Sequence, residues 1–182
     1  MAPADILSRA GIRPVLTRLP GGTPMVAGSH GLRLESSCSV DEISPDEAAG
    51  IFLPGGMPGT RHLGESAALG EILRQFHSRG KLIAAICAAP TVLHGLGMLR
   101  GMRATSHPSC AAELRDCRYV ESPVVVDRPV ITSRGPGTAL LCGLTLVACL
   151  SGARAALRLA EAMMIDVPGS IREEWSRWAT TM

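Results

Sequence analysis

The stretch Leu82-Ile-Ala-Ala-Ile-Cys-Ala-Ala-Pro90 decides how the rest of this sequence is interpreted. Its first five residues are all apolar and have the length of a buried strand, and Pro90 suits the first turn of a following helix. Cys87 therefore lies where a strand turns abruptly into a helix, and the small residues Ala88 and Ala89 let the backbone bend tightly. A bend of this kind holds a nucleophile above the edge of a sheet, by analogy with the serine elbow of hydrolases.

Strand-length apolar runs alternate with helix-period segments on both sides of this stretch, which predicts one α/β domain with a largely parallel sheet. We expect strands at 12–18, 50–54, 82–86 and 104–107, an extended pair within 25–34, two strands about a tight turn within 124–131, a helical start at 44–47, and helices over 4–10, 66–80, 139–150 and 153–164. Ser109 is expected to cap a helical turn over 110–115. The tail over 166–182, with Trp175 and Trp178, is left unassigned.

Composition narrows the class of partner. Lys and Arg number 18 against 16 Asp and Glu, and aromatic residues make up 3% of the 182 residues, so neither a basic stripe nor a base-stacking platform is expected. Nucleic acid is therefore an unlikely partner. No apolar run reaches the roughly 20 residues that span a bilayer, and the first residues do not resemble an export signal, so we expect a cytoplasmic protein.

Six cysteines are present, and only Cys87 has a context that favours chemistry. No Cys-x-x-Cys pair or zinc-type Cys and His spacing occurs, which predicts free thiols and no metal site. Cys142 and Cys149 lie seven residues apart on one expected helix, so packing on a shared face explains them. For Cys87 two interpretations stay open from the residues alone, a small apolar core residue or a nucleophile favoured by the helix that follows it.

Three other features lie near expected strand ends. His107 follows a short strand, where it could act as a base or orienting group for Cys87 or be an exposed loop histidine. Gly55-Gly56 follows a buried strand, so the Gly56 and Ala88 N–H groups could stabilise an oxyanion. Residues 133–138, Ser-Arg-Gly-Pro-Gly-Thr, are equally compatible with an anion-binding helix start and with a tight structural turn.

The combination and order of these motifs resemble those of the ThiJ/PfpI superfamily. They are Leu53-Pro-Gly-Gly56, the cysteine stretch, Thr105-Ser-His-Pro108 and Thr132-Ser-Arg-Gly-Pro-Gly-Thr138. The sequence is most similar to the group of the Parkinson-disease protein deglycase, over about residues 3–165. The resemblance implies a flavodoxin-like three-layer sandwich with a mostly parallel sheet, of the class I glutamine amidotransferase-like kind, that forms homodimers.

The resemblance also implies an activity and its residues. Cys87 matches the nucleophile, His107 the nearby histidine, and Gly56 and Ala88 the backbone oxyanion donors. The implied chemistry is a cofactor-free and metal-free glyoxalase or deglycase reaction on methylglyoxal or on glycated protein. Two alternatives remain, a redox sensor or chaperone that uses an oxidisable Cys87, and a Cys-His amide hydrolase. The hydrolase ranks last because no carboxylate follows His107 closely.

The sequence departs from the pattern of the family at several positions. Ala89 stands where the family has glycine, Met57 where asparagine is usual, and His30 where arginine is frequent. A first strand and a catalytic glutamate of the family would both precede Met1. We therefore expect the reading frame to begin roughly 15 to 25 residues upstream, the length of a strand, a turn and a helix start. Catalysis is conditional on that glutamate, whereas the cysteine elbow is contained in the chain.

Overall fold

The computed structural model describes residues 1–180 and is built around a four-stranded sheet in the order β5-β6-β10-β9. These strands are β5 (Gly50–Leu53), β6 (Leu82–Ile86), β9 (Val124–Asp127) and β10 (Val130–Ser133). Strands β5, β6 and β10 run parallel to one another, and β9 is antiparallel to β10. The carboxyl ends of the three parallel strands therefore meet at one edge of the sheet.

Strand β6 is covered on both faces, as its unbroken apolar sequence predicts. All five of its residues are buried. Leu82, Ala84 and Ile86 pack into one hydrophobic cluster, and Ile83 and Ala85 pack into the other. This alternation is what a pleated strand with two buried faces produces.

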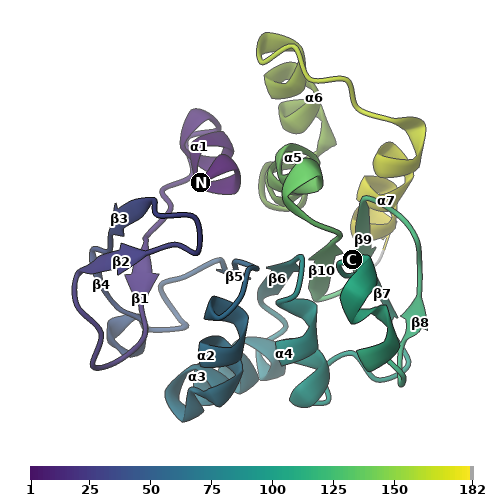
Figure 1. Cartoon of the computed structure of the whole chain (residues 1–182). Helices are drawn as coiled ribbons and strands as arrows, with labels where there is room; N and C mark the ends of the chain where they lie inside the picture. Colours follow the sequence, from purple (N-terminus) through teal and green to yellow (C-terminus); the bar gives the residue numbers. More distant parts are fainter. Residues whose placement is uncertain (181–182) are drawn as a thin grey trace.

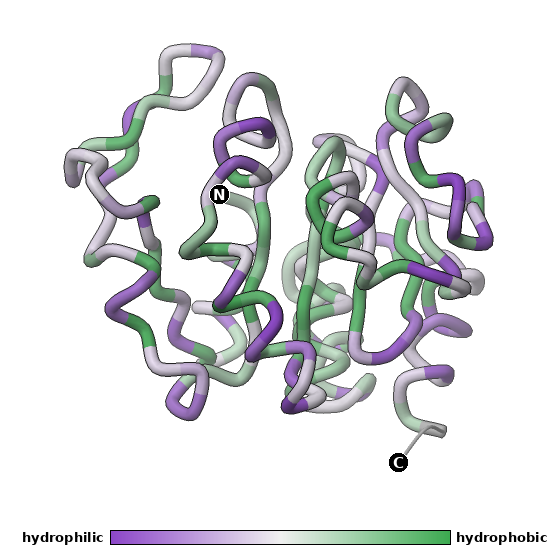
Figure 2. Tube along the Cα trace, turned by 90° about the horizontal axis from the view of Figure 1, so that it is seen from below, coloured by the Kyte–Doolittle hydropathy of each residue, from purple (hydrophilic) through white to green (hydrophobic). Residues whose placement is uncertain are grey.

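Helices cover both faces of the sheet and make three layers (Figure 1). One face carries α1 (Ala2–Arg9), α5 (Ala139–Ser151), α6 (Ala153–Ala162) and α7 (Gly169–Thr180), and the other carries α2 (Gly59–Glu65), α3 (Ala67–Ser78) and α4 (Pro90–Gly95). Hydrophobic segments gather toward the strands and the helix sides that face them (Figure 2). The flavodoxin-like three-layer arrangement expected from the sequence is confirmed.

Local signals placed several elements correctly. The Ser66 side chain accepts a hydrogen bond from Leu69 N–H at 3.3 Å and so caps α3, and Gly80 follows that helix with a φ of +63°. Helix α1 packs directly against α5 at Gly143. A Cβ added to this glycine would lie 2.8 Å from Ile6 Cδ1. A glycine is required at that crossing for the two helices to approach so closely.

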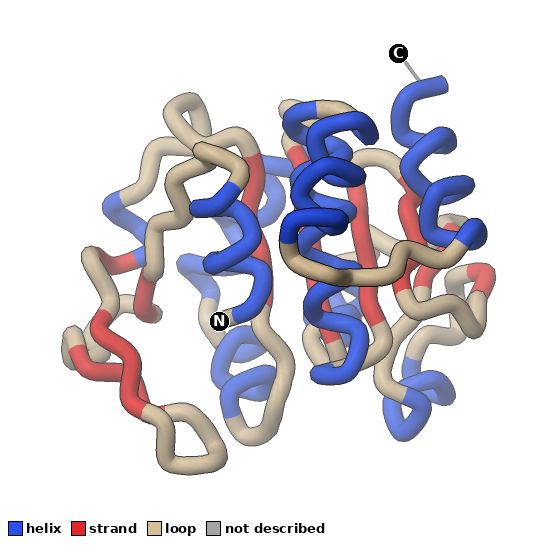
Figure 3. The backbone as a smooth tube through the Cα atoms, turned by 90° about the horizontal axis from the view of Figure 1, so that it is seen from above, coloured by secondary structure: helices blue, strands red, loops and turns tan. Residues whose placement is uncertain are grey.

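The remaining elements are short and lie at the margins of the molecule. Strands β1 (Thr17–Arg18) and β4 (Cys38–Ser39) form a small parallel pair, and β2 (Met25–Ala27) and β3 (Arg33–Glu35) form a hairpin that projects from this side (Figure 3). The others are η1 (Val40–Glu42), β7 (Arg103–Ala104), η2 (Pro108–Glu113), β8 (Arg118–Tyr119) and η3 (Pro136–Thr138).

Two expectations in this region are met only in part. The strand expected over 12–18 is reduced to its last two residues. The helical start expected at 44–47 is a single turn, in which Glu47 N–H donates to Ser44 O at 3.1 Å, and it does not continue as a helix. The sequence reasoning missed η1, which precedes this turn and is started by a capping box in which Ser39 N–H donates to Glu42 Oε1 at 2.8 Å.

The unassigned tail forms helix α7 and belongs to the core. Trp175 and Trp178 are buried, and Trp175 Nε1 donates to Thr145 Oγ1 at 2.9 Å. Glu174 accepts a hydrogen bond from Val126 N–H at 2.8 Å and pairs with Arg103. These contacts fix α7 against β9, whereas residues 181–182 lie outside the described part of the chain. No helix within residues 1–180 is long and apolar enough to cross a membrane.

Candidate active site

Cys87 directly follows β6 on a strained turn. Its φ is +66°, a left-handed conformation that non-glycine residues adopt rarely and at some cost in free energy. Two backbone hydrogen bonds hold the turn, since Cys87 N–H donates to Ser133 O at 2.9 Å and Cys87 O accepts from His107 N–H at 2.8 Å. The position of the thiol is therefore set from both neighbouring chain segments.

Gly55 leaves the space that the elbow needs. A Cβ at this position would lie 2.4 Å from Cys87 Cβ and 2.6 Å from Ile86 O, distances that no side chain tolerates. The sequence indicated a Gly-Gly turn here for its backbone N–H groups, and the structure gives the first glycine a steric role. Gly56 has a φ of +95°, which only glycine adopts readily.

Gly56 and Ala88, the two residues whose backbone amides the sequence suggested as oxyanion donors, both line the pocket in front of the elbow. The would-be Cβ of Gly55 is 3.3 Å from Ala88 N, so the Gly-Gly turn and the elbow are in contact. Among the hydrogen bonds of residues 1–180, none is donated by the N–H of Gly56 or of Ala88. Neither N–H group is therefore engaged within the described part of the chain.

The backbone N–H of His107 is hydrogen-bonded to Cys87 O, and the His107 imidazole contacts Ser109. Its Nδ1 accepts from Ser109 N–H at 3.3 Å and lies 2.8 Å from Ser109 Oγ. His107 therefore caps η2, the role that the sequence assigned to Ser109, because the helix begins at Pro108, two residues earlier than expected. Within the described residues, no hydrogen bond joins the imidazole to the thiol of Cys87.

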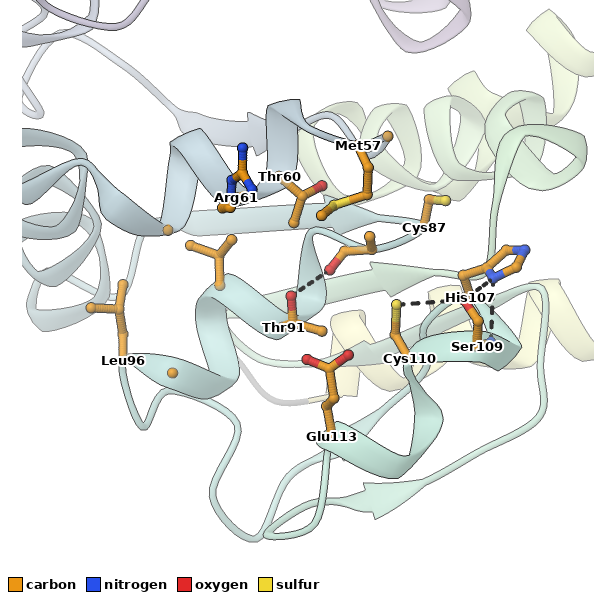
Figure 4. Close-up of a pocket in the computed structure, with 15 residues that line it drawn as sticks. Met57, Thr60, Arg61, Cys87, Thr91, Leu96, His107, Ser109, Cys110 and Glu113 are labelled. Carbon is orange, nitrogen blue, oxygen red and sulfur yellow. Dashed lines mark hydrogen bonds between the residues drawn. The ribbon is translucent and has the colours of Figure 1, made fainter. Parts of the chain in front are cut away.

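A pocket of about 740 Å³ opens in front of Cys87 (Figure 4). The four site residues named from the sequence, Gly56, Cys87, Ala88 and His107, all line it. Its other lining residues are Met57, Thr60, Arg61, Gly64, Thr91, Val92, Gly95, Leu96, Ser109, Cys110 and Glu113. Sequence reasoning missed Cys110 and Glu113 as site residues, although they follow His107 at intervals of three, the period of a 3₁₀ helix.

The other cysteines differ from Cys87 in their surroundings. Burial raises the pKa of the Cys142 thiol to about 12, and that of Cys149 also to about 12. Burial also raises the pKa of Cys117. These three thiols therefore stay protonated at neutral pH and are poor nucleophiles. Cys87 and Cys110 are both half-buried and line the pocket, and of these two only Cys87 lies at the end of a strand of the central sheet.

Comparison with known proteins agrees with this geometry. Residues 1–149 match the model of the DJ-1/PfpI family. The protein dj-1beta of Drosophila melanogaster is 39% identical over 164 residues, covering 89% of this chain and 87% of that protein. Its crystal structure superposes with a TM-score of 0.86 over 91% of this chain and 90% of the other, at 38% identity.

Two further relatives are informative. A solved structure of oxidised Toxoplasma gondii DJ-1 has a TM-score of 0.85 and 32% identity, and the match covers 91% of this chain and 90% of that one. A deglycase of Pyrococcus abyssi is 36% identical over 116 residues, covering 62% of this chain and 69% of that protein. From the sequence match and the shared structure, this chain belongs to the DJ-1/PfpI family.

Proposed function

We propose that this protein is a cofactor-free enzyme that converts 2-oxoaldehydes, or their adducts with amines and thiols, to 2-hydroxy acids through Cys87. The observation that carries the proposal is the strained elbow, which presents a thiol to a pocket beside two unengaged backbone N–H groups. A nucleophile with oxyanion donors next to it is what addition to a carbonyl requires. The name of the Pyrococcus abyssi relative, a deglycase, fits the same chemistry.

The reaction balances without an external oxidant or reductant. The Cys87 thiolate adds to the aldehyde carbon of methylglyoxal, and the oxyanion that forms accepts hydrogen bonds from Gly56 and Ala88 N–H. The proton on that carbon is removed, and a proton is added to the neighbouring ketone carbon, so the first carbon is oxidised to a thioester and the second is reduced to an alcohol. Water then cleaves the thioester, which releases lactate and regenerates the thiol.

His107 is the titratable side chain proposed to move these protons. It lines the pocket, and its Nδ1 is held by Ser109, so Nε2 is the nitrogen that remains for proton exchange. Within residues 1–180, no carboxylate hydrogen-bonds to this imidazole. The Cys-His amide hydrolase is disfavoured for that reason, because such sites orient the histidine with a carboxylate or amide side chain.

A redox sensor is the second candidate function, and the exposure of the thiol to the pocket favours it. A peroxide that reaches Cys87 would oxidise the thiolate to sulfenate and be reduced to water. The structure of the relative from Toxoplasma gondii is that of an oxidised form, which fits this chemistry. In this second function, which extends to the chaperone activity suggested by the family, Cys87 is modified and catalyses no turnover.

We also propose that the protein is a homodimer and that it works in the cytoplasm. Met25, Val26, Leu32 and Leu34 on the β2–β3 hairpin are exposed apolar side chains, which suits burial in a homodimer. All six cysteines are free, which suits a reducing compartment such as the cytoplasm.

The deciding experiment compares wild type with Cys87→Ala. Lactate formation from methylglyoxal is measured by an enzymatic lactate assay, and hydrogen peroxide treatment is followed by mass spectrometry of the Cys87 peptide. The proposed enzyme requires lactate formation by wild type and none by the variant, with Cys110→Ala as an active control for thiol loss in the same pocket. Equal inactivity of wild type and Cys87→Ala, with selective oxidation of Cys87, would instead establish the sensor.

A further inference from the structure

We propose that Glu113 makes the pocket selective for positively charged substrates, so that the preferred substrate is a dicarbonyl adduct of a cationic carrier such as a basic amino acid. This inference rests on the proposed function, since it names the substrate class of the same site. Glu113 is then a specificity-determining residue that touches the carrier. The reacting carbon stays with Cys87.

The placement of Glu113 relative to Cys87 follows from the backbone. His107 N–H donates to Cys87 O at 2.8 Å, and η2 runs from Pro108 to its last residue, Glu113. Six residues at the rise of a 3₁₀ helix span about 12 Å. The carboxylate of Glu113 therefore lies on the order of 10 Å from the thiol, at the other end of the same pocket.

The Glu113 carboxylate is available to a ligand. Figure 4 shows it directed into the pocket, toward Thr91 and beside Cys110. Within residues 1–180, the Glu113 carboxylate takes part in no hydrogen bond or ion pair, and the residue is exposed. It is also the only acidic residue among the described residues that line the pocket. A bound cation would therefore meet a carboxylate that has no competing partner.

Arg61, the cationic side chain on the opposite wall, does not cancel this charge. It lies 3.8 Å from Glu65 in an ion pair one helical turn along α2. Figure 4 shows its guanidinium directed away from Thr91 and Glu113. The Thr91 hydroxyl is uncharged and donates to Ala88 O at 2.8 Å. The end of the pocket formed by η2 is thus negative, which disfavours anionic carriers as well as favouring cationic ones.

The size of the pocket fits a carrier better than a free aldehyde. A volume of about 740 Å³ lies within the range of roughly 300 to 1,000 Å³ that holds ligands of drug size. A three-carbon aldehyde fills only a small part of that space. A basic amino acid, with its adduct at Cys87 and a charged group at Glu113, spans the distance between the two ends.

The first test measures the charge preference of the pocket without relying on catalysis. Cys87 is modified with the trimethylammonioethyl and the sulfonatoethyl methanethiosulfonate reagents, which have similar size and opposite charge. In each case the thiolate forms a disulfide with the reagent and releases methanesulfinate. Peptide mass spectrometry gives the rate at Cys87 alone. The variants are Glu113→Gln and Glu121→Gln, an exposed glutamate that does not line the pocket.

The ratio of the cationic to the anionic rate is the quantity to compare. One charge at about 12 Å, with an effective dielectric constant near 60, changes each rate by about twofold in opposite directions. Glu113→Gln should therefore lower the ratio about fivefold at low ionic strength, Glu121→Gln should leave it unchanged, and 1 M salt should remove the difference. A ratio that Glu113→Gln leaves at the wild-type value would refute the proposal.

The second test uses turnover, with methylglyoxal hemithioacetals of thiocholine, 2-mercaptoethanol and 3-mercaptopropionate as cationic, neutral and anionic substrates. Wild type should show the highest kcat/KM with the thiocholine adduct and the lowest with the 3-mercaptopropionate adduct, and Glu113→Gln should lower the ratio of these two values. If wild type turns over none of the three, the proposed enzyme is wrong, and the modification rates still decide whether Glu113 selects charge. Equal preferences in wild type and Glu113→Gln would refute the role of Glu113.

Discussion

Replacing Gly55 by alanine tests whether steric clearance at the elbow sets the reactivity of Cys87. A Cβ added at this position would lie 2.4 Å from Cys87 Cβ and 2.6 Å from Ile86 O. Neither atom is at the end of a flexible side chain, so relief requires movement of the backbone. The elbow itself is held by hydrogen bonds to Ser133 O and from His107 N–H, so moving it also strains those two bonds.

The expected cost follows from this overlap. Forcing one methyl group into a closely packed site costs about 1 to 3 kcal/mol. For a domain of this size, that loss lowers Tm by roughly 2 to 4 °C per kcal/mol. Gly59→Ala is the matched control, because an added Cβ there meets no atom within 4 Å and the residue lies in α2, where alanine is the better helix former. The control should therefore be neutral or slightly stabilising.

Two measurements decide the outcome. Urea unfolding gives the change in the free energy of unfolding, and the alkylation rate of Cys87 by iodoacetamide gives the change in reactivity. Gly55→Ala should lose stability and alter the rate at Cys87, whereas Gly59→Ala should keep the wild-type rate. A Gly55→Ala protein with wild-type stability and wild-type alkylation would show that the close approach of the two turns is not needed.

Two further predictions concern the core. Glu174→Gln should lower the free energy of unfolding by about 3 kcal/mol, because it leaves the Arg103 guanidinium without its buried partner, whereas the exposed Glu173→Gln should have little effect in the same urea titration. Stability should also fall as pH rises above 9, the ordinary pKa of a thiol, toward 12. In that window the unfolded chain releases protons from Cys142 and Cys149 that the folded chain retains, at about 1.4 kcal/mol per pH unit for each thiol, and alanine at both positions should flatten the slope.

How far the sequence predicts the fold depends on how local the stabilising contacts are. Strand β6 and helix α3 were predicted closely, because an unbroken apolar run and a serine cap are signals carried by neighbouring residues. Helix α7 was not assigned. Its stability depends on Glu174, which bonds to Val126 N–H and to Arg103, partners 48 and 71 residues away in the sequence. No local pattern contains those contacts.

The same distinction applies to the site. Cys87, His107 and the Gly-Gly turn could be predicted to lie together because each follows a strand end, where parallel sheets place ligands, and the structure places them around one pocket. Glu113 was missed because its importance depends on how η2 is oriented, and that orientation is set by the His107 side chain capping the turn. The steric role of Gly55 was missed because it arises between two segments that are distant in the sequence.

Backbone contacts hold the elbow in place, whereas side chains form the wall of the pocket. Backbone contacts from Ser133, His107 and Gly55 fix the thiol, so most substitutions of surface side chains leave its position unchanged. In our proposal, the charge that faces a substrate comes from the Glu113 side chain, which is exposed on η2. A substitution in η2 would then change substrate preference without moving the Cys87 thiol.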